Sequence, residues 1–336
     1  MQTAPKAARP LRILTNMAYW QSAVWTGRAD SIYPAHGRDI RGEWPVFRQV
    51  RDLLQRRRDY DVVVTLGVRE SMVYGLCCLL TGRAPRQIMT EVFIDEPRAS
   101  LAWRLKTALY GVVARRAWGH LTNSATEIDT MSARYRVPRE RFRFVPLNST
   151  LAGKPFSTQG DGFILAAGRT LRDYPCLIEA VRGLPNRVII ICGRDDTFAA
   201  PLPPNVTVLR EIGFEAYVDH IRRCTLLALP LRATGRATGQ VVALDAMAVG
   251  KPVIVTRMPG TVDYIRHDEN GLLVEPGDVE GLRAAIEALL ADPARRERLG
   301  RAAYADVQRL HSFDTHALAK LQAIEDLYAE AHRSLP

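Results

Sequence analysis

The sequence predicts an α/β protein with two doubly wound parallel sheets, one in each half of its 336 residues. Short apolar runs rich in β-branched residues alternate with longer segments of helical spacing, and this alternation is typical of parallel sheets. A polar segment rich in Gly, Ser and Thr, residues 147–161, separates two rounds of the alternation. A chain of this length also favours two domains over one.

The first round of alternation occupies residues 11–146. Its expected strands are 11–15, 61–67, 87–93, 120–124 and 142–146. Its expected helices are 46–58, 71–80 and 101–118, with another beginning near Ser124. We therefore expect residues 1–150 to form the first domain.

The second round begins at Phe163. Its expected strands are 163–167, 188–192, 206–209, 225–229 and 253–255, with a further strand before residue 278. Its expected helices are 175–181, 215–223, 241–248, 279–290 and 293–309, followed by an amphipathic helix over 315–331. Residues 155–314 should form the second domain.

The excess of positive over negative charge lies entirely in the first half of the chain. Residues 1–150 hold 24 Lys and Arg against 13 Asp and Glu, whereas residues 151–336 hold 22 against 23. Such an excess favours an anionic partner: a membrane surface, a phosphorylated or lipid-linked acceptor, or nucleic acid. A solvated basic face of an arginine-rich protein would have the same composition. No nucleic-acid motif is present, so a nucleic-acid partner is not expected.

The segment 101–118 concentrates this positive charge among apolar residues. Leucines and valines alternate there with Arg104, Lys106, Arg115 and Arg116, and tryptophans stand near both ends. The pattern fits a basic helix lying at a membrane interface. It fits equally well a helix that packs on the core and solvates its basic face.

Several protein classes are disfavoured by what the sequence lacks. No apolar run reaches the ~18 residues of a membrane span. Residues 1–16 have no apolar core of a secretory leader, so we expect a cytoplasmic protein. The five cysteines lack metal-ligand spacing and are interpreted as reduced thiols. No G-x-G-x-x-G follows the first strand, which disfavours a dehydrogenase. Asp59-Tyr60-Asp61 precedes a strand, so we interpret it as a turn rather than a metal site.

Residues 239–278 are the most informative stretch. Gly239 and Gln240 precede the apolar segment VVALDAMA, whose helix would point free backbone N–H groups and the positive end of its dipole into the preceding loop. Gly250 would end that helix in the left-handed conformation. A buried parallel strand, 253–255, follows. A helix N-terminus beside the carboxyl end of a parallel strand predicts a phosphate-binding crevice.

The same stretch resembles the donor-binding signature of retaining GT-B glycosyltransferases, family 4 in particular. The matching residues are 244–248, 250–254, 259–260 and 270–278. The resemblance implies the GT-B fold, in which two Rossmann-like doubly wound domains face a central cleft. It also implies that the first domain binds the acceptor, that the second binds a nucleotide-sugar donor, and that a last helix, 315–333, packs back on the first.

The resemblance assigns donor binding to the loops after the strands of the second domain. Gly168 and Arg169 match the family's Gly-Arg pair, and Arg172 stands near the place of the lysine that shares the diphosphate. Either arginine could instead form a surface salt bridge. Asp245 matches the carboxylate that bonds the ribose hydroxyls, with an ordinary helix residue as the alternative. The other expected donor-lining residues are Gly193, Arg194, Leu209, Thr238, Gly239, Gln240 and Val241.

The sequence departs from the family pattern at two places. Ala237 replaces a glutamate that contacts the donor in many relatives, and the arginines and Gln240 of the loop 232–240 are candidates to compensate. The family's acceptor-side histidine is also absent. Glu91 and Asp95 stand there instead, and we expect them to orient the acceptor hydroxyl, with capping roles as the alternative.

The sequence therefore predicts an enzyme that transfers a sugar from a nucleotide donor to an acceptor hydroxyl. The resemblance implies that the transfer proceeds with retention and without a metal or other cofactor. Arg169, Arg172 and the amides of residues 239–241 would stabilise the leaving diphosphate. UDP is the expected nucleotide, with GDP next. The expected acceptor is anionic, lipid-linked or a carbohydrate, and peripheral contact with the inner face of the plasma membrane would suit the basic first domain. The alternatives are a sugar-nucleotide epimerase or hydrolase of the same fold, and a non-catalytic nucleotide-sugar-binding protein.

Overall fold

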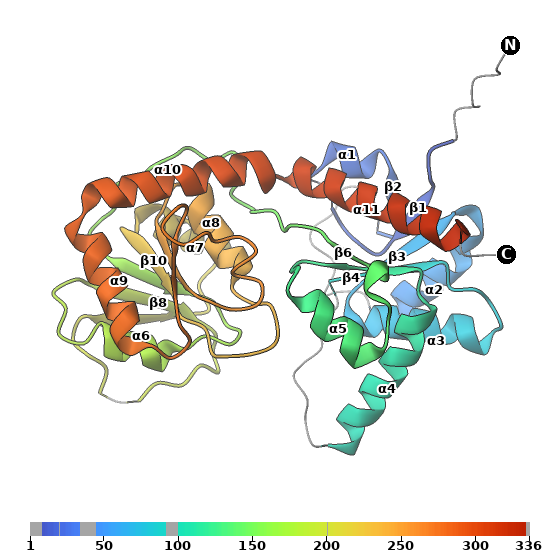
Figure 1. Cartoon of the computed structure of the whole chain (residues 1–336), viewed down its shortest axis with the longest axis horizontal. Helices are drawn as coiled ribbons and strands as arrows, with labels where there is room; N and C mark the ends of the chain where they lie inside the picture. Colours follow the sequence, from blue (N-terminus) through green and yellow to red (C-terminus); the bar gives the residue numbers. More distant parts are fainter. Residues whose placement is uncertain (1–8, 20, 34–44, 92–99, 200, 334–336) are drawn as a thin grey trace, which may run out of the picture. The chain divides into compact units, whose positions relative to one another are not determined.

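The computed structural model describes residues 9–19, 21–33, 45–91, 100–199 and 201–333. Contacts between residues divide the chain into two units (Figure 1). The first unit comprises residues 1–122, 128–145 and 317–336, and the second comprises residues 123–127 and 146–316. Within the described residues, each unit contains one six-stranded sheet whose neighbouring strands all pair in parallel.

The first sheet has the strand order β2-β1-β3-β4-β5-β6. Its strands are β1 (Ile13–Thr15), β2 (Ala29–Ser31), β3 (Val62–Leu66), β4 (Gln87–Thr90), β5 (Gly119–Thr122) and β6 (Phe142–Phe144). The helices of this unit are α1 (Ala23–Thr26), α2 (Val46–Arg56), α3 (Val68–Leu80), α4 (Leu101–Arg116), α5 (Glu127–Tyr135) from residue 128 onward and α11 (Phe313–Arg333) from residue 317 onward, with short 3-10 turns at Arg57–Asp59 and Arg139–Arg141.

Alternate residues of the first sheet enter cores on its two faces. Val62 and Val64 pack with Trp25 of α1 and with Leu321 and Ile324 of α11. The opposite face meets α2, α3, α4 and α5, through residues such as Leu53, Tyr74, Tyr110 and Ile128. Figure 1 shows α2, α3 and α4 on one side of this sheet and α11 on the other. The layer α2–α4 and the helix α11 therefore cover different faces.

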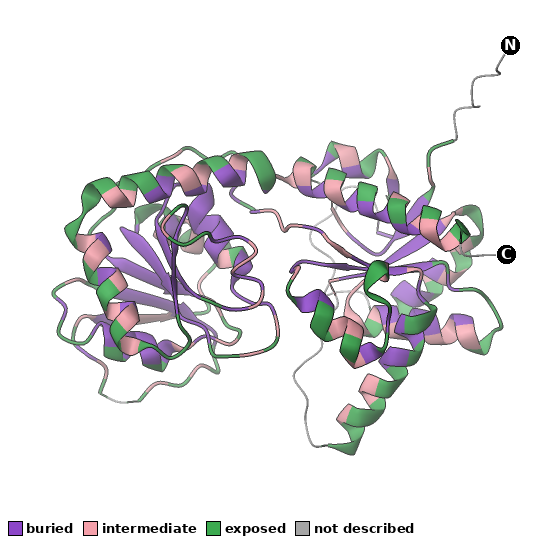
Figure 2. Cartoon of the chain, in the orientation of Figure 1, coloured by how far each residue is buried: buried purple, intermediate pink, exposed green. Residues whose placement is uncertain are grey.

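The second sheet has the strand order β12-β11-β10-β7-β8-β9. Its strands are β7 (Ile164–Ala167), β8 (Val188–Cys192), β9 (Val206–Arg210), β10 (Leu226–Leu229), β11 (Val253–Thr256) and β12 (Leu272–Val274). Its helices are α6 (Tyr174–Ala180), α7 (Phe214–Arg223), α8 (Gln240–Ala248), α9 (Val279–Ala291) and α10 (Pro293–Leu310). The central strands are buried along their whole length, as Figure 2 shows.

Helix α8 is the most buried helix that follows a strand of this sheet. Seven of its nine residues are buried, so it carries no polar face. Gly250 ends the helix with φ +83°, as the sequence predicts, and Phe156 fills the space where a side chain would stand. Because its flanks are covered, α8 can offer a ligand little beyond its N-terminal turn.

The structure confirms the predicted α/β fold with two parallel sheets. Most expected strands and helices lie within three residues of their predicted bounds; residues 92–93 of the expected strand 87–93 are outside the described part. Two short elements, α1 and the edge strand β2, were not predicted. Residues Ala29–Ser31 form β2 through backbone pairing with β1, and they lack the apolar run by which strands are recognised. Among the described residues, none of the helices combines the length and apolar character that crossing a membrane requires.

Candidate functional site

The strand order of the second sheet locates its binding edge. The chain crosses to the other side of β7 when it passes from β9 to β10, so β7 and β10 adjoin where their connections diverge. Ligands of open α/β sheets bind at the carboxyl ends of the strands at such a switch point. The loop 168–173 follows β7, and the loop 230–239 follows β10 and leads into α8.

Hydrogen bonds hold these two loops together. The Asp173 N–H donates to the Pro230 carbonyl at 3.0 Å, and the Arg232 N–H donates to the Leu171 carbonyl at 2.9 Å. Farther along, the Thr238 hydroxyl reaches the Thr170 carbonyl at 3.4 Å. The predicted diphosphate loop and the N-terminus of α8 are therefore neighbours, although 70 residues separate them in the sequence.

Arg172 supports the loop from inside. It is 7% exposed, and it donates from Nε to the Ala167 carbonyl at 2.9 Å and from Nη1 to the Thr170 carbonyl at 2.6 Å. Burial lowers the pKa of its guanidinium. Gly168 has φ +124°, and a Cβ there would lie 2.2 Å from the Arg172 guanidinium. The glycine thus leaves room for the arginine. The diphosphate role of Arg172 stays a prediction, and in that role Nη2 would contact the phosphate, since Nε and Nη1 already donate to backbone carbonyls.

Arg169 is the exposed cation of the loop. Its side chain is 64% exposed and forms an ion pair with Glu211 at 3.1 Å. The other oxygen of Glu211 accepts the Arg194 N–H at 3.0 Å, and a Cβ on Gly193 would lie 3.3 Å from Cγ of Arg169. Predicted residues from the loops after β7 and β8 thus meet at the carboxyl end of β9.

Glu211 is a residue of this edge that the sequence did not single out. It follows β9 directly and has φ +51°, a left-handed conformation that is uncommon for residues other than glycine. Strained backbone of this kind gathers at functional sites. Leu209, predicted to lie near the base, is two residues earlier in β9 and pairs with Ile191 of β8.

The N-terminus of α8 has the geometry of an anion site. Gly239 is its N-cap residue with φ +86°, and no side chain caps the first turn. Its free N–H groups and the helix dipole therefore face the loops described above. A Cβ on Gly239 would lie 2.9 Å from Leu231, so a larger residue does not fit without a shift. Val241 is 49% exposed beside it.

Gln240 and Ala237 lie behind this turn. Gln240 is 6% exposed, and its Nε2 has no acceptor among the described residues. Ala237, which replaces the family's glutamate, donates its N–H to the Glu127 carboxylate at 2.6 Å. A carboxylate from another segment of the second unit therefore reaches this alanine. Gly260 is packed so closely that a Cβ there would lie 2.6 Å from both Ala237 and Gln240.

Asp245 is held by hydroxyl groups. One carboxylate oxygen accepts from Ser149 at 2.7 Å and Thr150 at 3.1 Å, and the other accepts from Tyr217 at 3.1 Å. Burial raises the pKa of Asp245, and these hydrogen bonds act in the opposite direction. The carboxylate is 2% exposed, so a ribose could bond it only by taking the place of one of these donors. Its ribose role stays a prediction.

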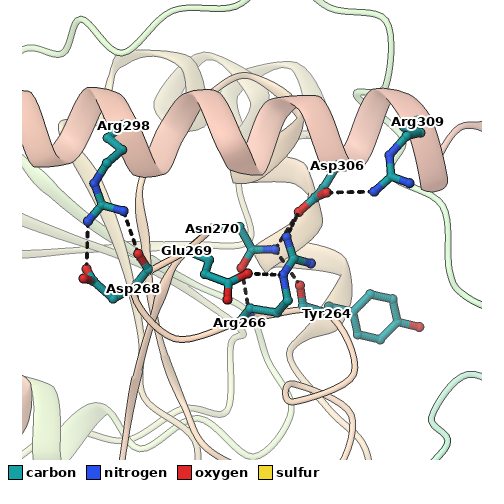
Figure 3. Close-up of polar contacts among 8 residues, drawn as sticks. All are labelled: Tyr264, Arg266, Asp268, Glu269, Asn270, Arg298, Asp306 and Arg309. Carbon is teal, nitrogen blue, oxygen red and sulfur yellow. Dashed lines mark hydrogen bonds and ion pairs between the residues drawn. The ribbon is translucent and has the colours of Figure 1, made fainter.

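The end of the signature forms a structural network rather than part of this edge (Figure 3). Asn270 donates to Asp306 at 2.9 Å and to the Tyr264 carbonyl at 3.0 Å, and Arg266 donates to Asp306 at 2.7 Å. Burial alone would raise the pKa of Asp306, but these donors outweigh it and lower the pKa. The turn before β12 is thereby fastened to α10.

The carboxyl edge of the first sheet carries a buried ion pair. Lys320 of α11 is 1% exposed, and its Nζ lies 3.2 Å from the carboxylate of Glu91, just after β4. The same ammonium lies 5.9 Å from the ring centre of Tyr19, in the loop after β1. Glu91 has φ +51°, so this predicted acceptor residue is also strained. Lys320 was not predicted, and Asp95 lies outside the described residues.

Comparison with known proteins finds similarity to glycosyltransferases. Residues 152–306 match the family model described as "Glycosyl transferases group 1", a range that includes every predicted donor residue. The chain is 29% identical over 181 residues to the lipopolysaccharide core biosynthesis glycosyltransferase LpsE of Rhizobium meliloti, covering 52% of this chain and 50% of that protein. It is 35% identical over 133 residues to a glycogen synthase of Mycobacterium tuberculosis, covering 38% and 30%. The chain thus spans half or less of the length of these curated relatives.

Solved structures resemble the chain over a longer range. HepE of Anabaena, in complex with UDP-glucose, has a TM-score of 0.68 and 17% identity, covering 97% of this chain and all of that one. Sucrose-phosphate synthase of Thermosynechococcus elongatus has a TM-score of 0.66 and 20% identity, covering 90% and 84%. The fold is GT-B. At sequence identities this low, the structural similarity identifies the GT-B fold but not the reaction.

Proposed function

We propose that this protein is a glycosyltransferase that transfers a sugar from a nucleotide donor to an acceptor hydroxyl. The observation that carries the proposal is the meeting of an uncapped helix N-terminus with the Arg169 loop at the switch point of the second sheet. An anionic diphosphate is the ligand that such a site favours. The family match over residues 152–306 supports the same edge.

We propose that the chain's own groups stabilise the leaving diphosphate. Arg169 is exposed and free to turn from Glu211 toward a phosphate, since an ion pair between groups this exposed is worth only about 0–1 kcal/mol. The N–H groups of residues 240 and 241 add oriented dipoles that need no reorganisation. Retention and independence of metal are proposed from the resemblance alone.

A uridine nucleotide is the proposed donor base, with guanosine next. The complexes of HepE with UDP-glucose and UDP support this choice. The acceptor is proposed to be a lipid-linked or carbohydrate molecule, which the names of LpsE and of a capsular polysaccharide glycosyltransferase among the relatives support. Glu91 is proposed to orient the hydroxyl of the acceptor. Peripheral contact with the inner face of the plasma membrane is proposed as well.

A thermal-shift panel of UDP, GDP and their sugars tests the donor site, because a ligand of the native state raises Tm by mass action. We expect a shift with one base that Arg169→Ala loses. Arg182→Ala is the matched control: Arg182 is an exposed arginine paired with a glutamate, and it follows α6 at the opposite edge of the sheet. An equal shift in wild type and Arg169→Ala would refute the assignment.

Turnover separates the rival functions. In Arg169→Ala, kcat/KM should fall by on the order of 100-fold, corresponding to roughly 3 kcal/mol for one lost donor to a developing charge. Release of UDP only with an acceptor present supports transfer, whereas release without one indicates a hydrolase. The buried Asp245 and the alanine at position 237 favour a non-catalytic binding protein as second candidate. Binding without turnover over a broad acceptor panel would support that function.

A further inference from the structure

Helix α4 exposes apolar side chains along its outer face. Leu101, Leu105, Leu109 and Val112 are 80%, 60%, 36% and 41% exposed. Their spacing of four, four and three residues places them in one stripe of an α-helix. The opposite face of the same helix, including Tyr110 and Val113, is already buried in the core under the first sheet. The outer stripe is therefore not needed for folding this unit.

Cations border the stripe. At 3.6 residues per turn, Arg104 and Arg115 lie along one side of it, and Arg116 continues it by one turn beyond Val112. Helix α4 contains no Asp or Glu. Among the described residues, the side chains of Arg104 and Arg116 have no hydrogen-bond or ion-pair partner, whereas the Arg115 side chain donates to the Tyr135 carbonyl. An exposed apolar stripe with basic borders is the pattern of helices that bind at a membrane interface.

The neighbouring helices of the same layer repeat this chemistry. Phe47 of α2 is 78% exposed and Leu80 of α3 is 86% exposed. A cavity of about 750 Å³ opens beside Phe47, lined by apolar side chains and by Arg51, Arg57, Arg58, Arg83 and Arg86. Its mixture of apolar walls and guanidinium groups suits the phosphate and the chain of an amphiphile.

We propose that the layer α2–α4 docks the protein on an anionic lipid bilayer. The stripe of α4 enters the boundary between headgroups and acyl chains, while Arg104 and Arg116 bind lipid phosphates. A second copy of the chain fits this surface less well, because a two-fold contact would set the arginine borders against each other. The inference deepens the proposed membrane contact and does not depend on the donor site.

Sedimentation of the full chain with lipid vesicles tests the proposal. Wild type should bind vesicles of 70% phosphatidylcholine and 30% phosphatidylglycerol, and it should bind pure phosphatidylcholine at least tenfold more weakly. Leu101→Gln/Leu105→Gln should reduce binding to the mixed vesicles at least tenfold. Arg104→Gln/Arg116→Gln should reduce it about 25-fold, at roughly fivefold for each cation near the surface.

Two controls separate membrane binding by α4 from other causes of a change in sedimentation. Leu318→Gln changes a leucine that is 56% exposed on α11, over the other face of the same sheet, and should bind like wild type. The α4 variants should unfold at the wild-type Tm, because the changed side chains are exposed, so loss of vesicle binding is not loss of folding. Equal binding by wild type and both α4 double variants would overturn the proposal. Failure of wild type to bind mixed vesicles, or a dimer that the leucine changes dissociate, would overturn it too.

Discussion

Replacing Glu91 with glutamine should destabilise the protein by roughly 3 kcal/mol, because breaking a buried ion pair leaves the other charge uncompensated. The ammonium of Lys320 is 1% exposed, so water cannot take the place of the lost carboxylate. Glutamine keeps the size of the side chain and an acceptor oxygen, so it isolates the charge. The loss should appear as an unfolding midpoint several degrees below wild type.

Replacing Lys320 with methionine should have a much smaller effect, under about 1 kcal/mol. The side chain of Glu91 is 28% exposed, so water can solvate its carboxylate once the lysine is gone. Methionine keeps the apolar stem of the side chain on the buried face of α11 beside Leu321 and Ile324. The double variant should resemble Lys320→Met, since it leaves no charge buried.

Urea unfolding of the two single variants and the double variant measures this asymmetry. Glu325→Gln is the control, because Glu325 lies on the same helix as Lys320 and pairs with Arg28. Both side chains of that pair are more than a third exposed, so the change should cost less than about 1 kcal/mol. Equal losses for Glu91→Gln and Lys320→Met would refute the reasoning. An acceptor KM raised in both variants at unchanged donor affinity would support Glu91 in acceptor binding.

Three further outcomes follow from single residues. Burial lowers the pKa of His120 to about 4, whereas the unfolded chain takes up this proton near pH 6.5. The unfolded state therefore binds more protons as the pH falls, and wild type should lose about 2 kcal/mol between pH 7 and pH 5 that His120→Gln retains in urea titrations. Asp245→Asn should not lower Tm, because burial raises the pKa of this carboxyl and ionising it weakens the fold; if Asp245 binds ribose, calorimetry should still find donor affinity at least tenfold weaker. Gly239→Ala, at φ +86° and 2.9 Å from Leu231, should cost about 1–2 kcal/mol and weaken donor binding, and a variant with wild-type Tm and affinity would contradict the close packing.

The sequence predicts the strands of both sheets well because buried parallel strands are continuous apolar runs. Val62–Leu66 and Val188–Cys192 are examples whose observed bounds differ from the predicted ones by at most one residue. The edge strand β2 lacks such an apolar run, since one face of an edge strand needs no apolar cover. Spacing along the chain therefore predicts what lies inside a sheet better than what lies at its edge.

Side-chain roles at the candidate site are harder to predict, because they depend on partners distant in sequence. Arg169 and Arg172 look alike in the sequence, yet one is exposed and the other is folded onto the carbonyls of its own loop. In the sequence, Lys320 is one of several polar residues in an amphipathic helix. Only the packing of α11 places its ammonium beside Glu91, which lies 229 residues earlier in the chain. Asn270 belongs to the signature, but it serves the turn before β12 rather than a ligand.

The discontinuity of the first unit has a consequence for how the protein is made. Its core contains Ala317, Leu321, Ile324 and Leu327 of α11, packed against strands that are synthesised roughly 200 to 300 residues earlier. During translation the second unit, residues 123–127 and 146–316, is complete before these side chains leave the ribosome. One apolar face of the first sheet stays uncovered through that interval. We therefore expect the second unit to mature first, and nascent chains that end before residue 317 to be the species that chaperones bind.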